Sequence, residues 1–159
     1  MSLRSAISRN VTALQPEYVR RAPAAGGRDA VFRFSVPVLR ARDVAVTVAW
    51  YRRHLGFAAE VFPERGPLEF AILERDGVQL LVRRAGEGRR PDDGHSGWDL
   101  YLWVDGVDFG RLEAAFAPSG QLVRPVSPMS ETISELEIRD PDGYVLCIGG
   151  PHRSGITRS

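Results

Sequence analysis

Two short segments in the second half of the chain carry side chains that could bind a small molecule. Residues 98–104 and 134–139 alternate between aliphatic side chains and aromatic or charged ones. Such alternation predicts strands whose successive side chains point to opposite faces. If the aliphatic residues face the helices, the other face carries Asp99, Tyr101, Trp103, Glu135 and Glu137. Flat aromatic rings favour planar ligands and carboxylates favour cations, so this set predicts a site for a planar ligand that can carry positive charge.

The same residues have a second interpretation that involves no ligand. Aromatic side chains on strands are commonly core or subunit-interface residues. Strand carboxylates can be solvated, or paired here with Arg83 and Arg139. Cys147, the only cysteine, is predicted to be a small buried residue, because no histidine accompanies it on its strand. We assign no catalytic residue, and the residues alone leave both interpretations open.

A faint internal repeat indicates what positions these segments. Residues 39–57 and 102–120 each read as the end of a strand, an aspartate and an amphipathic helix. Each is followed by a hairpin that closes on an Asp-Gly pair, first Asp76-Gly77 and then Asp142-Gly143. Two similar units on one chain predict a cavity where two half-sheets meet.

The elements of the two units can be predicted from periodicity and from capping residues. Asp43 and Gly56 begin and end the first helix, and Asp105 or Gly106 begins the second, which covers residues 107–116. The predicted strands cover residues 32–39, 57–62, 70–75, 78–83, 98–104, 121–125, 134–139 and 144–149, with a polar loop at 126–132.

Composition predicts one globular domain. The chain has 159 residues, of which 43% are apolar and 26% charged. We expect a flexible Arg-rich extension at 1–30, a single domain of two modules (31–84 and 98–150) within 31–150, and a tail at 151–159. No basic patch with interleaved aromatics is present, which argues against nucleic acid as a partner. No apolar run is long enough to cross a membrane and no secretory signal is evident, so we expect a cytoplasmic protein.

Three motifs resemble one known superfamily. They are VPVLRARDV at 36–44, Leu55-Gly56-Phe57 after the first helix, and RDPDG at 139–143. In order and spacing they resemble the vicinal-oxygen-chelate superfamily of glyoxalase I, ring-cleaving dioxygenases and bleomycin-resistance proteins, and the first two are most similar to the bleomycin-resistance branch. The resemblance covers residues 35–149. It implies an α+β fold of two βαβββ modules, which form a curled mixed sheet around a concave site, and a homodimer.

The resemblance also completes the predicted ligand site. It places one face of the strand at 70–75 inside the concavity, and Gln79 follows in the next strand. The predicted ligand-binding residues are therefore Phe70, Ile72, Gln79, Asp99, Tyr101, Trp103, Glu135 and Glu137.

The superfamily's metal enzymes take their ligands, typically His and Glu, from four strands. The matching positions here lie near Val36, Leu81, Asp99 and Cys147, and neither they nor their neighbours include His or Glu. The histidines at 54, 95 and 152 share no predicted strand with another candidate ligand. We therefore predict no metal and no cofactor.

The resemblance implies a metal-free protein that sequesters a planar cationic antibiotic of the bleomycin type. Bleomycin-binding members carry an aromatic residue in the loop before the penultimate strand, and the matching position here lies near Thr132. Two alternatives remain: a metal-dependent lyase or dioxygenase with displaced ligands, and a non-enzymatic interaction module in which residues 1–30 dock on an acidic partner.

Overall fold

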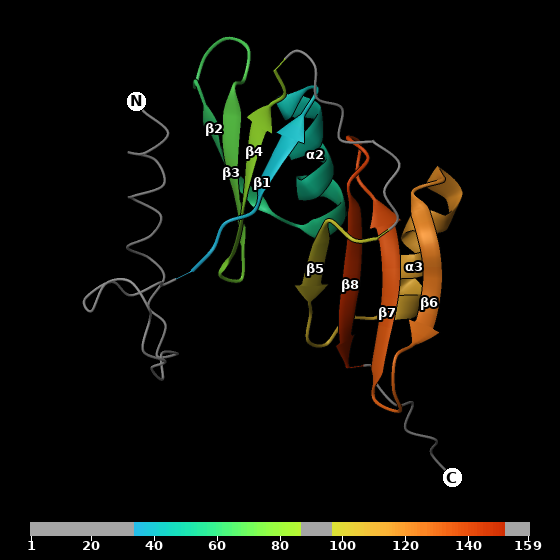
Figure 1. Ribbon diagram of the computed structural model, residues 1–159. Coiled ribbons are helices and arrows are strands. Elements are labelled where there is room, and N and C mark those ends of the chain that lie inside the picture. The colour runs from blue at the N-terminus through green and yellow to red at the C-terminus, as the bar shows by residue number, and fades with distance from the viewer. Residues whose placement is uncertain (1–33, 87–96, 152–159) are drawn as a thin grey trace, which may run out of the picture. The chain divides into compact units, whose positions relative to one another are not determined.

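The computed structural model describes residues 34–86 and 97–151, which divide into two compact units after Arg84 (Figure 1). The predicted extension at 1–30, His95, His152 and the tail from 152 lie outside the described residues. No helix in the described ranges is long and apolar enough to cross a membrane.

The first unit contains one helix and a four-stranded mixed sheet. Its elements are β1 (Val38–Ala41), α2 (Val44–Leu55), β2 (Ala58–Phe62), β3 (Phe70–Arg75) and β4 (Val78–Arg84). The strand order is β1-β4-β3-β2, with β1 parallel to β4 and the other pairs antiparallel.

The second unit repeats this arrangement. Its elements are β5 (Leu100–Trp103), α3 (Phe109–Phe116), the short 3-10 helix η1 (Ala117–Ser119), β6 (Leu122–Pro128), β7 (Ile133–Arg139) and β8 (Val145–Pro151). The order β5-β8-β7-β6 matches that of the first sheet, again with the first and last strands parallel. The predicted repeat and the α+β fold of two βαβββ modules are confirmed. A single site shared by the two modules stays a prediction.

Local sequence signals explain the elements of the first unit. The Asp43 carboxylate caps α2 by accepting hydrogen bonds from the backbone N–H groups of Ala45 (2.9 Å) and Val46 (3.3 Å). Gly56 ends the helix in the left-handed region, with φ of 68°. Asp76 and Gly77 both have positive φ, at 51° and 82°, as a two-residue turn between twisted strands requires.

The predicted boundaries of β1, α3 and β6 were wrong. β1 begins at Val38, because Pro37 has no N–H that could donate to the neighbouring strand. The carbonyl of Pro37 still accepts a hydrogen bond from the backbone N–H of Leu81. Asp108 caps α3, while the carboxylate of Asp105 instead accepts a hydrogen bond from the Trp103 indole. β6 continues through the predicted loop to Pro128, since it is an edge strand, where proline is tolerated, and its second register shift spans Pro125.

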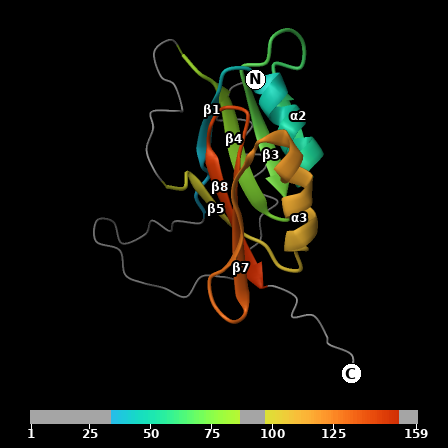
Figure 2. The ribbon, with the colours of Figure 1, turned by 90° about the vertical axis from the view of Figure 1, so that its right-hand side faces the viewer.

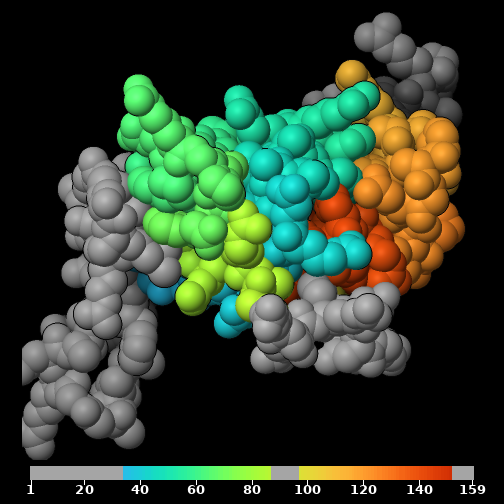
Figure 3. Space-filling view, turned by 90° about the horizontal axis from the view of Figure 1, so that it is seen from above, coloured from blue at the N-terminus to red at the C-terminus, as the bar shows by residue number. Residues whose placement is uncertain are grey.

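In each unit the helix covers one face of its sheet (Figure 2). The aliphatic residues of β7 and β8 that alternate toward α3 are buried, namely Leu136, Ile138, Leu146 and Ile148. The side of α2 that points away from its sheet stays exposed (Figure 3). The exposed residues of α2 include Val46, Arg52 and Arg53. Because strand side chains alternate, the second face of each sheet is left to a different set of residues.

Candidate functional site

The second sheet carries two rows of side chains on the face opposite α3. The strand register aligns Tyr101 of β5 with Cys147 of β8, Glu137 of β7 and Arg124 of β6. The next row is Trp103, Gly149, Glu135 and Ser127. The structure therefore brings together four of the eight predicted ligand-binding residues on one face.

Glu135 lies at the centre of a hydrogen-bonded network on this face. Only 2% of its side chain is exposed. One carboxylate oxygen accepts a hydrogen bond from the Tyr101 hydroxyl at 2.8 Å, and the other accepts one from Nη2 of Arg124 at 3.2 Å. A buried carboxylate is costly unless such partners compensate it, so Tyr101 and Arg124 make its burial possible.

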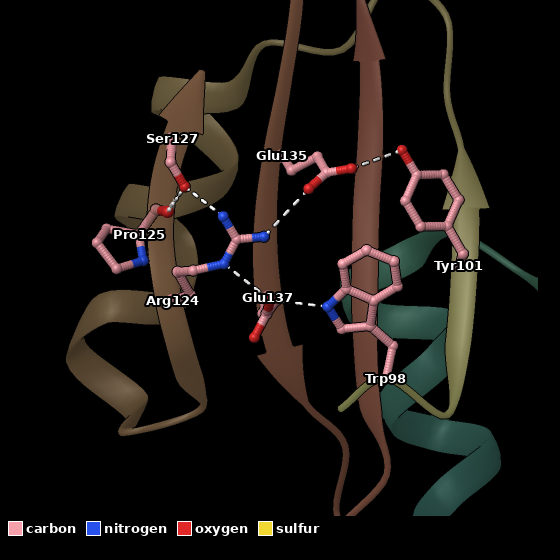
Figure 4. Close-up of polar contacts among 7 residues, drawn as sticks. All are labelled: Trp98, Tyr101, Arg124, Pro125, Ser127, Glu135 and Glu137. Carbon is pink, nitrogen blue, oxygen red and sulfur yellow. Dashed lines mark hydrogen bonds and ion pairs between the residues drawn. The ribbon is translucent and has the colours of Figure 1, made fainter. Parts of the chain in front are cut away.

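Glu137 extends the same network. Its Oε1 atom accepts hydrogen bonds from the Trp98 indole (2.8 Å) and from Nε of Arg124 (2.7 Å). Arg124 also donates to the Ser127 hydroxyl at 2.5 Å. The polar contacts thus run across the width of the sheet, from β5 to β6 (Figure 4).

Small residues on β8 allow the side chains of β5 to reach β7. A Cβ atom built on Gly149 would lie 2.1 Å from the Tyr101 hydroxyl oxygen and 2.8 Å from its Cζ. Both distances are far below van der Waals contact. Glycine at this position therefore allows the Tyr101 ring to lie across β8 with its hydroxyl on Glu135.

The network changes the acidity of its members. The hydrogen bond to Glu135, together with burial, raises the pKa of Tyr101 to about 12. Burial acts to raise the pKa of Glu137, but the hydrogen bond from Trp98 and the Arg124 guanidinium outweigh it and lower that pKa. Burial raises the pKa of Cys147 to about 11, so at neutral pH it is a protonated thiol and not a nucleophile.

Three aromatic side chains remain exposed beside this network. Trp98, Tyr101 and Trp103 are 45%, 42% and 50% exposed. The rings of Trp98 and Tyr101 have centroids 5.3 Å apart and are tilted by 52°. The Trp98 and Tyr101 rings are held by hydrogen bonds to Glu137 and Glu135, and both keep apolar area open to a planar ligand.

The other predicted ligand-binding residues lie elsewhere. Asp99 precedes β5, and its carboxylate accepts the backbone N–H of Val145 at 2.8 Å. In the first unit, Phe70 stacks on Phe62 with centroids 4.6 Å apart, and Ile72 is buried in the same apolar cluster. The register pairs Gln79 with Glu74 on the same sheet face.

Sequence reasoning missed the cation of the network. The acidic residues of β7 pair with Arg124, whereas Arg139 donates to the carbonyl of Gly143. Arg124 is the only arginine between residues 121 and 132. Its position on the strand next to two carboxylates at i and i+2 was a usable signal, but the sequence pattern does not show which charges meet across strands. Trp98 and Ser127 were missed as well.

Within the described residues, no three His, Cys, Asp or Glu side chains are grouped so that they could hold a metal ion. Leu81 and Cys147, two of the positions matched to the superfamily's ligands, are buried. Asp99, a third, is bonded to Val145. The side chains at these positions do not fit the His- and Glu-rich site of the metal enzymes.

No protein-family model and no curated protein matches the sequence. Solved structures do match the fold. TioX from Micromonospora sp. ML1 is 23% identical with a TM-score of 0.59, and the match covers 77% of this chain and 98% of that one. A glyoxylase/bleomycin resistance protein/dioxygenase domain from Frankia sp. EAN1pec is 23% identical with a TM-score of 0.60, over 79% and 96%. A lactoylglutathione lyase from Agrobacterium tumefaciens is 19% identical with a TM-score of 0.56, over 76% and 95%.

These structures show the fold of this chain, which is that of the glyoxalase, bleomycin-resistance and dioxygenase proteins. At such identities a shared fold does not specify an activity, because this fold supports several chemistries.

Proposed function

We propose that the protein is a metal-free binding protein that sequesters a planar, cationic small molecule on the aromatic face of the second sheet. The ligand would lie on Trp98, Tyr101 and Trp103, with the carboxylates of β7 beside it. The protein would hold the molecule without changing it, as the bleomycin-resistance branch does.

The observation that carries this proposal is the exposure of three aromatic rings next to a hydrogen-bonded network centred on the buried Glu135. An exposed apolar patch rimmed by polar groups commonly marks an interaction site. Two of the rings are anchored by hydrogen bonds to the carboxylates of Glu137 and Glu135, so they lose little further freedom when a ligand binds. The protonated, buried Cys147 and the lack of a metal-ligating cluster among the described residues favour binding over catalysis.

Thr132 is the main departure from the bleomycin-binding pattern. It lies in the exposed turn between β6 and β7, where its backbone N–H donates to the hydroxyl of Ser130. Without an aromatic ring at this position, stacking on the ligand must come from Trp98, Tyr101 and Trp103. We propose phleomycin and bleomycin as first ligands because they combine a planar bithiazole with a cationic tail.

Calorimetric titration of phleomycin into Trp103→Ala and Phe34→Ala tests the proposal. Both residues are exposed aromatics, at 50% and 42%, but only Trp103 belongs to the proposed face. We expect Trp103→Ala to weaken binding by about fivefold or more, since stacking on an aromatic ring contributes on the order of 1 kcal/mol or more. Phe34→Ala should bind normally. Equal affinity in the two variants would place the ligand elsewhere.

A further inference from the structure

The charges of the network do not balance. It contains two carboxylates, Glu135 and Glu137, and one guanidinium, Arg124. Residues 97–151 as a whole hold nine acidic residues against three arginines, a formal charge of −6. One negative charge on the aromatic face therefore has no partner within the network, and the surrounding charge does not supply one.

The hydrogen bonds locate this unbalanced charge at one atom. Both oxygens of Glu135 accept a hydrogen bond, and Oε1 of Glu137 accepts two. Within the part of the chain that the structure describes, no group donates to Oε2 of Glu137. Figure 4 shows that the dashed contacts of Glu137 all meet at its other oxygen. Oε2 is thus an acceptor held in place by bonds to its neighbour.

We propose that Glu137 Oε2 binds an N–H donor of a ligand that carries a single positive charge on a planar group, such as an amidinium or a protonated heteroaromatic amine. This inference rests on the proposed function and specifies the ligand's charge. The Trp98 indole is bonded to the same carboxylate, so a cation at Oε2 also lies beside an aromatic ring.

Arg124 reduces the uncompensated negative charge of the network to one. Its side chain is 36% exposed, and its guanidinium neutralises one of the two carboxylates. Arg124 would repel the second charge of a ligand with two adjacent positive charges. Glu137 would repel an anion. Arg124 therefore leaves one uncompensated negative charge on this face, which one positive charge of a ligand can neutralise.

Three probes that share a ring system separate charge from shape. They are 9-aminoacridine, a planar monocation at neutral pH, acridine, its neutral counterpart, and acridine-9-carboxylate, an anion. We expect 9-aminoacridine to bind about tenfold or more tighter than acridine, as a charge-assisted hydrogen bond would give, and the carboxylate to bind weakest.

Glu137→Gln tests the assigned atom. The amide keeps an oxygen that can accept from Trp98 and Arg124 but removes the negative charge at Oε2. We expect this variant to bind 9-aminoacridine about as weakly as acridine, with acridine binding unchanged, which also reports that the site is intact. Glu131→Gln is the matched control, because it removes an exposed charge from the same unit outside the network. This control variant should keep the preference for 9-aminoacridine over acridine.

Three outcomes would overturn the inference. If the parent protein binds acridine and 9-aminoacridine equally, the charge assignment is wrong while the proposed planar site stands. If Glu131→Gln loses the preference as fully as Glu137→Gln, the effect is general electrostatics and not a contact at Oε2. If none of the three probes binds saturably, the inference and the proposed planar site both fail.

Discussion

Gly149→Ala is the substitution that most sharply tests how the network is built. A Cβ atom at this position would lie 2.1 Å from the Tyr101 hydroxyl oxygen and 3.3 Å from Cγ of Glu135. The backbone of Gly149 itself does not lie in the left-handed region, so alanine causes no strain there. Any loss of stability must therefore come from displacement of the Tyr101 ring, which would break its hydrogen bond to Glu135.

The magnitude follows from opposing effects. A hydrogen bond to a charged group contributes about 1.5–3 kcal/mol, and the lower end applies because Tyr101 is partly exposed. Alanine is more favourable than glycine in a strand interior by roughly 0.5–1 kcal/mol. With about 0.5–1.5 kcal/mol for a ring forced from its rotamer, Gly149→Ala should lower the free energy of unfolding by about 1–2 kcal/mol.

Urea unfolding of a double-mutant cycle with Tyr101→Ala isolates the clash. Without the ring, Gly149→Ala should cost less than about 0.5 kcal/mol or should stabilise the protein. Gly150→Ala is the control, because its Cβ would lie 2.0 Å from the backbone oxygen of Val104 and should be costly in both backgrounds. If Gly149→Ala is as costly without Tyr101 as with it, the account of Gly149 is wrong.

Three further predictions concern single groups. Because the pKa of Tyr101 is raised in the folded protein from 10.0 to about 12, its contribution to stability is present below pH 10 and is lost as the pH rises through 12. Unfolding measured across this range should show that loss in the parent but not in Tyr101→Phe. Cys147 is fully buried with its pKa raised to about 11, so iodoacetamide should modify it only after denaturation, as mass spectrometry would report. Asp43→Ala should lower the free energy of unfolding by about 1 kcal/mol while Asp43→Asn largely keeps it; equal losses would mean that the cap is not the cause.

Sequence patterns predicted most of the fold because its signals are local. Asp43 and Gly56 mark the ends of α2, and the Asp76-Gly77 pair marks the first hairpin. Similar signals recur in the second half of the chain, and this recurrence is what indicated two equivalent modules. The end of β6 was harder to predict, because its prolines indicate a loop and only the pairing with β7 shows that the strand continues past them.

The site was predicted in part. Alternation placed Tyr101, Trp103, Glu135 and Glu137 on one face, where the structure has them. Alternation does not reveal which charges meet across strands, so the pairing with Arg124 was missed. Alternation also does not show how deeply a side chain is buried. Ile72 belongs to a buried cluster, and Glu135 is covered by its own hydrogen-bond partners.

Tryptophan fluorescence of the unmodified protein, titrated with phleomycin, tests the central claim most directly. Trp98 and Trp103 are exposed on the proposed face, whereas Trp50 is buried in the first unit. We expect saturable quenching at one ligand per chain, because the ligand would cover the two exposed indoles. Fluorescence that falls only in proportion to added ligand, without saturation, would contradict it.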